Sequence, residues 1–241
     1  MSMLQEALDY ATRGFFVFPC REKPGTPYKN KNGEMLTPQE KTPYTSQGLD
    51  DATLDSDQII AWWSTYPNAM VGVNAGKSGL FVVDIDRKHV DGLDTYSKWN
   101  INDSAGLQSI TPSGGQHIVF SGSGKSSSNA KTGIDTRGEG GYFIAPPSKI
   151  LEGEHAGEYK RFNDWGKTPG VIPDGLMANL FPDKTVEYVK GSSSITSGNK
   201  KQLSRATLNF ITNGAMPGER NTTLFKVIAD FAGCGYTQAE T

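Results

Sequence analysis

Two aspartates end an apolar stretch of the sequence, Gly79–Asp86, which reads GLFVVDID. If this stretch is a strand, its side chains alternate, and Asp84 and Asp86 point to the same face about 6–7 Å apart. Carboxylates this close repel each other, and a divalent cation relieves the repulsion because hard cations such as Mg²⁺ prefer oxygen ligands. The alternative is a strand that ends in solvent before an ordinary charged turn, and D-x-D alone does not decide between the two.

A second segment, TPSGGQHIVF (Thr111–Phe120), places Ser113, Gly114 and Gly115 just before an expected strand that begins at His117. Glycines let the backbone approach an anion closely, and exposed amides in such a turn can donate to phosphate oxygens. A lone histidine in an apolar strand is more often structural than functional. The serine and glycines before it keep a phosphate site open as the alternative.

A third segment, GIDTRGEGGYFIAPPS (Gly133–Ser148), carries Asp135 and Arg137 two positions apart, on one face if the chain is extended. Asp135 could be a third carboxylate of a metal cluster. Arg137 could orient that carboxylate or contact a phosphate. The alternative is a surface salt bridge in a hairpin.

Other motifs point away from competing chemistries. Gly72–Ser78 resembles a phosphate-binding P-loop, but only three residues separate its glycines and a strand, not a helix, is expected after it. We therefore expect a tight turn there. Cys20 and Cys234 have no zinc-ligand or disulfide-framework spacing. A relaxase-like nuclease would want a His-x-His pair, which the three histidines do not form: His89, His117 and His155.

The composition sets the class of protein that positions these residues. The chain has 241 residues, of which 36% are hydrophobic and 21% charged, so a folded core is expected. The formal charge of −2 excludes a globally basic nucleic-acid binder but not a local basic groove. The sequence shows no signal peptide and no apolar run long enough to span a bilayer, so we expect a cytoplasmic protein without membrane contact.

The hydrophobic pattern predicts alternating helices and strands. Helices are expected over 4–11, with Ser2 as N-cap and Gly14 as the stop, after an N-cap at Asp55 or Ser56, and over 93–99. Residues 21–50 are expected to form a long loop. The mixture predicts an α+β or α/β fold with a central sheet covered by helices. Strands are expected over 15–18, 70–73, 80–86, 107–110, 117–120, 141–145 and 149–151.

The composition changes near Lys190. Residues 191–203 begin with GSSSITSGNKK and are predicted to be a flexible linker between a domain over 1–190 and a helical segment over 204–241. An amphipathic helix is expected around residues 224–231. Too few residues follow the linker to build an independent core, and we expect the chain to be a fragment of a longer polypeptide.

In this order, VVDID, SGGQHIVF and GIDTRGEGGYFIAPPS resemble the bifunctional primase–polymerase domain of the archaeo-eukaryotic primase superfamily, found in phage and plasmid replication proteins. EALDYATRGFFVFPC and DATLDSDQIIAWWSTYPNAMVGVNAG resemble its N-terminal half, so that the resemblance covers residues 4–182. Arg205–Thr237 resembles the start of the helical domain that often follows, beyond which a helicase domain commonly lies.

The resemblance implies an α+β primase-like core with an RRM-like sheet and a smaller N-terminal α/β unit. It implies that Asp84, Asp86 and Asp135 hold Mg²⁺ or Mn²⁺, and that His117 contacts the triphosphate of the incoming nucleotide. The turn before His117 would belong to the nucleotide site, with Ser113, Gly114 and Gly115, and so would Arg137. No cysteine lies near the histidine strand, so we expect no zinc.

The function implied is that of a template-dependent nucleotidyltransferase, a DNA primase and polymerase acting on a single-stranded DNA template, a primer, and NTP or dNTP. Four lysines in polar loops are candidate contacts to the nucleic acid: Lys29, Lys31, Lys125 and Lys131. The alternative is a non-catalytic module on the same fold that binds an origin or single-stranded DNA.

Overall fold

The computed structural model describes residues 2–87, 90–129 and 131–182. The chain divides into two units, Met1–Lys184 and Thr185–Thr241, and the described residues all belong to the first. The linker predicted over 191–203 and the helical segment predicted over 204–241 lie outside the described residues. The predicted domain boundaries therefore stay predictions.

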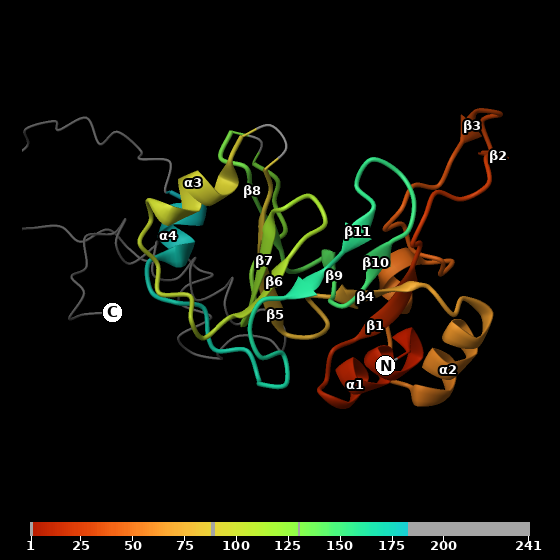
Figure 1. Cartoon of the computed structure of the whole chain (residues 1–241), viewed down its shortest axis with the longest axis horizontal. Helices are drawn as coiled ribbons and strands as arrows, with labels where there is room; N and C mark the ends of the chain where they lie inside the picture. The colour runs from red at the N-terminus through yellow and green to blue at the C-terminus, as the bar shows by residue number, and fades with distance from the viewer. Residues whose placement is uncertain (1, 88–89, 130, 183–241) are drawn as a thin grey trace, which may run out of the picture. The chain divides into compact units, whose positions relative to one another are not determined.

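The described chain mixes helices with antiparallel sheets, which confirms the α+β class (Figure 1). The helices are α1 (Met3–Thr12), α2 (Ser56–Thr65), α3 (Gly92–Ser97), α4 (Leu176–Leu180) and the 3-10 helix η1 (Gly48–Asp51). The first six strands are β1 (Val17–Cys20), β2 (Tyr28–Lys29), β3 (Met35–Leu36), β4 (Met70–Asn74), β5 (Leu80–Ile85) and β6 (Leu107–Ile110). The others are β7 (Gln116–Ser121), β8 (Ile134–Arg137), β9 (Tyr142–Ile144), β10 (Lys149–Ile150), β11 (Gly157–Glu158) and β12 (Lys160–Arg161).

Three strands in the order β1-β4-β9 form the sheet that packs against α1 and α2. Both helices begin as their capping residues predict: Ser2 accepts a hydrogen bond from the N–H of Gln5, and Asp55 accepts from the N–H groups of Asp57 and Gln58. The apolar faces of α1 and α2 bury Tyr10 and Trp63. This packing fixes the N-terminal part of the fold.

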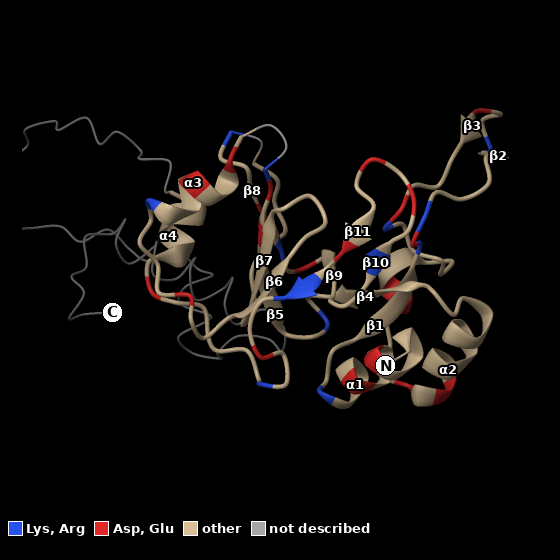
Figure 2. Cartoon of the chain, viewed as in Figure 1, with Lys and Arg blue, Asp and Glu red and all other residues tan. Residues whose placement is uncertain are grey.

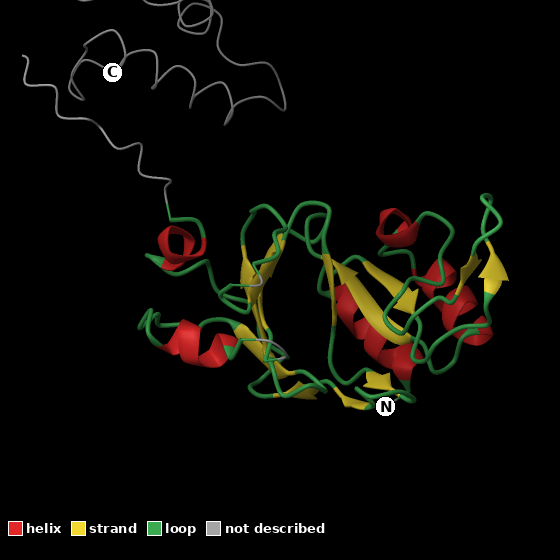
Figure 3. Cartoon of the chain, turned by 90° about the horizontal axis from the view of Figure 1, so that it is seen from above, coloured by secondary structure: helices red, strands yellow, loops and turns green. Residues whose placement is uncertain are grey.

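A five-stranded sheet in the order β12-β6-β7-β5-β8 carries the three segments that the sequence singles out. Strand β5 is buried on both faces because alternate side chains enter different cores. Leu80 and Val82 belong to the cluster shared with α1 and α2, whereas Phe81, Val83 and Ile85 pack with residues of α3 and α4. Seen from above, the helices lie on the outer sides of the two sheets (Figure 3).

The structure departs from the predicted elements in the N-terminal third. The first strand, expected over 15–18, is β1 and runs to Cys20, because Pro19 is tolerated in an edge strand of the sheet. The loop expected over 21–50 contains the hairpin β2–β3 and η1. Among the described residues no helix is long and apolar enough to cross a membrane.

Candidate active site

Strand register brings three of the predicted site residues into one row. Asp84 on β5 lies directly opposite His117 on β7 and directly opposite Asp135 on β8. Directly opposed residues of an antiparallel pair project from the same face of the sheet with Cβ atoms about 5 Å apart. The segments that carry these residues are far apart in the sequence, yet their polar side chains meet at β5, which lies between β7 and β8.

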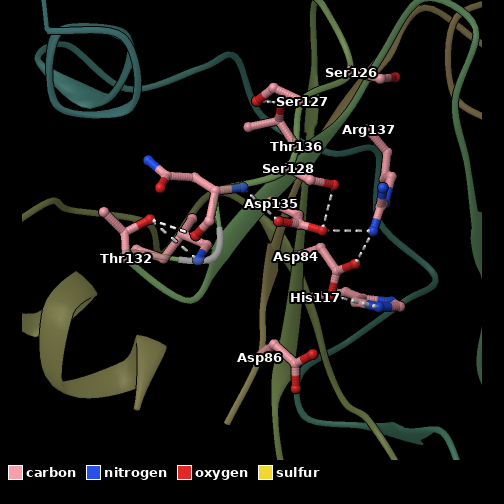
Figure 4. Close-up of polar contacts among 12 residues, drawn as sticks. Asp84, Asp86, His117, Ser126, Ser127, Ser128, Thr132, Asp135, Thr136 and Arg137 are labelled. Carbon is pink, nitrogen blue, oxygen red and sulfur yellow. Dashed lines mark hydrogen bonds and ion pairs between the residues drawn. The ribbon is translucent and has the colours of Figure 1, made fainter. Parts of the chain in front are cut away.

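Arg137 joins the two carboxylates of this row. Its Nη2 lies 2.9 Å from Oδ2 of Asp84 and 3.0 Å from Oδ2 of Asp135 (Figure 4). Two residues beyond Asp135 on β8, it projects from the same face of the sheet. The Asp135–Arg137 ion pair of the sequence-based alternative does form, but the guanidinium also binds Asp84 on another strand, so the pair is part of a larger cluster.

Asp135 is also held by the polar loop that precedes β8. Ser128 donates its hydroxyl to Oδ2 of Asp135 at 2.9 Å, and the backbone N–H of Asn129 donates to Oδ1 at 2.9 Å. With Arg137, the carboxylate accepts three hydrogen bonds from the protein. Its orientation is therefore fixed by both the loop and its own strand.

The charges of the row stabilise one another. Burial by itself would raise the pKa of Asp84, but His117 and Arg137 outweigh it and hold the pKa of this carboxyl well below its usual range. Burial would likewise lower the pKa of Arg137, but Asp84 and Asp135 raise it. Asp84 is therefore an ionised carboxylate and Arg137 a fixed cation.

His117 is buried, with 5% of its surface exposed, so the expectation of a residue embedded in an apolar strand is met. Its Nε2 lies 3.3 Å from Oδ1 of Asp84, and its ring packs against Phe143 and Tyr159. Nδ1 has no hydrogen-bond partner in the described part of the chain. A buried ring with one nitrogen on a carboxylate has a fixed orientation, and it lines the same cavity as Asp84.

Asp86 follows the last residue of β5 and lies apart from the row, farther along the strand (Figure 4). Its backbone N–H donates to the carbonyl of Gly133, and its Oδ1 accepts from the N–H of Arg87 at 2.7 Å. Ile85, between the two aspartates, is fully buried on the opposite face. The alternation predicted for VVDID is thus confirmed.

The turn before β7 closes on the end of β5. Gly114 has a φ of 80° and donates its N–H to the carbonyl of Thr111, whereas Gly115 passes so close to Ile85 that a Cβ would lie 2.2 Å from its carbonyl oxygen. Ser113 exchanges a hydrogen bond with the hydroxyl of Thr111 at 3.2 Å. The glycines allow the turn to pack this closely, and Ser113 faces the cavity beside it.

A cavity of about 420 Å³ opens above the row. Six of the predicted residues line it: Asp84, Asp86, Ser113, His117, Asp135 and Arg137. Five polar residues that the sequence did not single out also line it: Lys41, Thr111, Ser126, Tyr142 and Tyr159. Tyr142 follows a glycine pair shortly after Arg137, and this position next to a candidate site residue could have indicated it from the sequence. Lys41 lies in a long polar loop whose sequence does not indicate a site residue.

The other predicted features fall elsewhere. Gly72–Ser78 ends one strand and turns into β5, so the expectation of a tight turn rather than a P-loop is confirmed. Lys29 lies in the β2–β3 hairpin, away from β5 and β8, and Lys125 lies in the loop that holds Asp135 (Figure 1). Basic and acidic residues are scattered over the described elements, except that β12 consists of two basic residues, Lys160 and Arg161 (Figure 2). The lysine contacts to nucleic acid stay predictions.

The carboxylates suit a hard divalent cation in kind, because their oxygens are the ligands that Mg²⁺ and Mn²⁺ prefer. Within the described residues, however, no three His, Cys, Asp or Glu side chains lie close enough together to hold a metal ion. Asp84 and Asp135 share a guanidinium nitrogen instead, and Asp86 stands apart. A joint metal site of the three aspartates stays a prediction.

The family of the chain follows from a comparison with family models. A family model described as bifunctional DNA primase/polymerase, N-terminal, matches residues 7–174 of the chain, which is more than half of its length. The matched range contains the three-stranded and the five-stranded sheet and the whole row of polar residues. A search of curated proteins finds no match.

Proposed function

Because the chain belongs to the bifunctional DNA primase/polymerase family, we propose that it is a template-dependent nucleotidyltransferase that makes and extends primers in phage or plasmid replication. The family supports primase and polymerase activity on DNA and nucleotide substrates. The single observation that carries the assignment to particular residues is the row His117–Asp84–Asp135, which three adjacent strands place in one cavity.

The reaction would be an in-line displacement at the α-phosphate of the incoming nucleotide by the 3′-hydroxyl of a primer. Divalent cations, when bound, lower the pKa of that hydroxyl and offset the charge of the leaving pyrophosphate. We propose that Asp84, Asp86 and Asp135 hold them. The low pKa of Asp84 supports this role, because a ligand must be ionised.

The groups for the triphosphate would come from the cavity wall. His117 is held by Asp84 on one side, so its ring is oriented without any ligand. Ser113 and Lys41 line the same cavity and supply a hydroxyl donor and a positive charge. We propose that these side chains, with the Gly114–Gly115 turn beside them, hold the phosphates while Asp84 and its neighbours hold the cations.

The remaining parts of the proposal rest on the family resemblance. The strand order β6-β7-β5-β8, with α3 between β5 and β6, supports an RRM-like sheet. We also propose that the chain binds a DNA template and a primer, and that it acts together with a helicase domain.

Substitution of single aspartates tests the assignment. We expect Asp84→Ala and Asp86→Ala to abolish incorporation of labelled NTP or dNTP on a primed template, whereas binding of single-stranded DNA is retained. Asp86→Ala is the cleaner variant, because it leaves the Arg137–Asp84 pair in place. Asp94→Ala removes an exposed carboxylate paired with Lys98 and serves as the charge-matched control. Incorporation that persists in Asp86→Ala would contradict the site.

The second candidate is a non-catalytic module that binds an origin or single-stranded DNA. One observation favours it: a guanidinium already joins the two carboxylates that a metal would share. The same assay separates the two functions, because the module would bind DNA with unchanged affinity in every variant and incorporate no nucleotide even as wild type.

A further inference from the structure

The position of Arg137 decides what the two carboxylates of the row can bind. A single nitrogen, Nη2, contacts Oδ2 of Asp84 and Oδ2 of Asp135. Because these two oxygens belong to opposed residues on neighbouring strands, the point between them is where a shared cation would have to lie. The guanidinium occupies that point.

The other oxygens of the pair also face donors of the chain. Oδ1 of Asp84 lies 3.3 Å from Nε2 of His117, and Oδ1 of Asp135 accepts from the N–H of Asn129. Oδ2 of Asp135 also accepts from the hydroxyl of Ser128, which carries no charge, so Arg137 is the cation that a metal ion shared through the two Oδ2 atoms would meet. Arg137 and a shared metal ion would need the same two oxygens, and their like charges repel.

The side chain of Arg137 can move away from the two carboxylates, whereas that of His117 cannot. About a third of its side chain is exposed, at 30%, and it lines the cavity. His117 is 7% exposed at the side chain and packed between two aromatic rings. A long arginine side chain can move from the carboxylates into the cavity without disturbing a core.

We propose that Arg137 is a displaceable counter-cation that competes with a divalent cation for Asp84 and Asp135. Without metal, it offsets the repulsion between two carboxylates and keeps the row assembled. To admit a metal, Arg137 has to release Oδ2 of both aspartates, and the released guanidinium remains in the cavity where an anionic triphosphate would be received. The role rests on the proposed metal site and adds to it a residue that weakens metal binding while no nucleotide is present.

The test is binding of Mn²⁺ alone, followed by the electron paramagnetic resonance signal of the free ion, with no nucleotide or DNA. Arg137→Gln should bind Mn²⁺ more tightly than wild type by about tenfold, because one close like charge is removed. Lys98→Gln removes the same charge from an exposed pair at the C-terminal end of α3 and should leave the affinity unchanged. Equal affinities of Arg137→Gln and wild type, or weaker binding by the variant, would overturn the proposal and leave the metal site standing.

Thermal melting and a second variant test the same proposal if the Gln variant is difficult to measure. In EDTA, Arg137→Gln should melt below wild type, because its carboxylates lose their counter-cation, and Mn²⁺ should raise the Tm of the variant more than that of wild type. Arg137→Lys keeps the charge in a compact form that bridges two carboxylates less well. Its affinity for Mn²⁺ should lie between those of wild type and Arg137→Gln, and it replaces the Gln variant in the test if that variant does not fold. Absence of Mn²⁺ binding in wild type and both variants at millimolar concentration would overturn the proposed metal site together with this inference.

Discussion

His117 and Asp84 lie directly opposite each other on β7 and β5, with Nε2 3.3 Å from Oδ1. The row continues beyond the histidine to Ser109 on β6, which lies directly opposite His117. Ser109 is fully buried, and neither its hydroxyl nor Nδ1 of His117 has a hydrogen-bond partner among the described residues. The polar row therefore has its hydrogen bonds made at the Arg137 end, whereas at the Ser109 end two of its polar atoms lack a hydrogen bond within the described part of the chain.

Two fully buried serines should respond differently to removal of their hydroxyls. Ser109→Ala removes an unpartnered hydroxyl and should leave the free energy of unfolding unchanged or raise it by up to about 1 kcal/mol. Ser148→Ala removes the acceptor of the Val71 N–H and should lower it by about 1–2 kcal/mol. Urea unfolding of both variants measures the difference. A larger loss for Ser109→Ala than for Ser148→Ala would show that Ser109 has a partner of its own.

The hydroxyl of Ser128 should matter for activity because it orients Asp135. Ser128→Ala should reduce the rate of primer extension by about tenfold, the usual effect of removing a group that orients a metal ligand. Ser128→Thr keeps the hydroxyl and should recover most of the rate. Ser97→Ala, at an exposed serine of α3, is the control. If alanine and threonine at position 128 behave alike, the hydroxyl does not position Asp135.

Substitutions of the two glycines before β7 distinguish the effect of close packing from that of backbone strain. A Cβ on Gly115 would lie 2.2 Å from the carbonyl oxygen of Ile85, so Gly115→Ala should displace the turn and lower the free energy of unfolding by about 3 kcal/mol. Gly114→Ala meets no atom within 4 Å but keeps a φ of 80°, and should cost about 1 kcal/mol. Chemical denaturation compares the two. Similar losses would mean that the approach to Ile85 is not a constraint.

Glu6 and Arg161 link α1 to the five-stranded sheet. Glu6 is buried, at 4% exposed, and its carboxylate accepts from Nη2 of Arg161 on β12. Glu6→Gln should lower the free energy of unfolding by about 1–3 kcal/mol, less than for a fully buried pair because the side chain of Arg161 is 35% exposed. A double-mutant cycle with Arg161→Gln isolates the pair. Additive losses would show that the two side chains do not interact.

Tyr10 should make stability depend on alkaline pH. Burial, which outweighs Arg161, raises the pKa of Tyr10 to about 12, and its hydroxyl donates to the carbonyl of Pro146. The unfolded phenol ionises at pH about 10 and the folded one at about 12. The contribution of Tyr10 to the free energy of unfolding is therefore complete below pH about 10 and is lost as the pH rises toward about 12.

Tyr10→Phe isolates this contribution. At pH 8 the variant should be less stable by about 1 kcal/mol, for the lost hydrogen bond. By pH 11 wild type should have lost about 1.4 kcal/mol that the variant does not lose, so the gap should close. Urea unfolding at the two values measures it, and the other tyrosines cancel in the difference. A gap that stays constant would contradict the raised pKa.

Local patterns predicted most of the elements around the site. Ser2 and Asp55 cap helices where their side chains can reach free N–H groups, and the alternation in VVDID predicted which side chains of β5 enter the core. The type and order of the residues also located the site, because Asp84, His117 and Asp135 do lie in one row. These features depend on contacts between residues close in sequence or on chemistry shared with a family.

The rest depends on strand register, which no single segment encodes. Arg137 binds Asp84 only because β8 pairs with β5 in one register, and a shift of one residue would turn it to the opposite face. Lys41 reaches the cavity from a polar loop whose path is set by tertiary contacts, including the hydroxyl of Tyr142 on its carbonyl. Such pairings require knowledge of the whole sheet.

The place of β5 in its sheet has a consequence for the timescale of motion at the site. Its backbone is paired on one side with β7 and on the other with β8, and both faces are buried, so its amide hydrogens should exchange with solvent only through near-global opening. Strand β8 lies at the sheet edge, where local opening costs less. We therefore expect Asp84 and Asp135 to lie on strands that open at different frequencies.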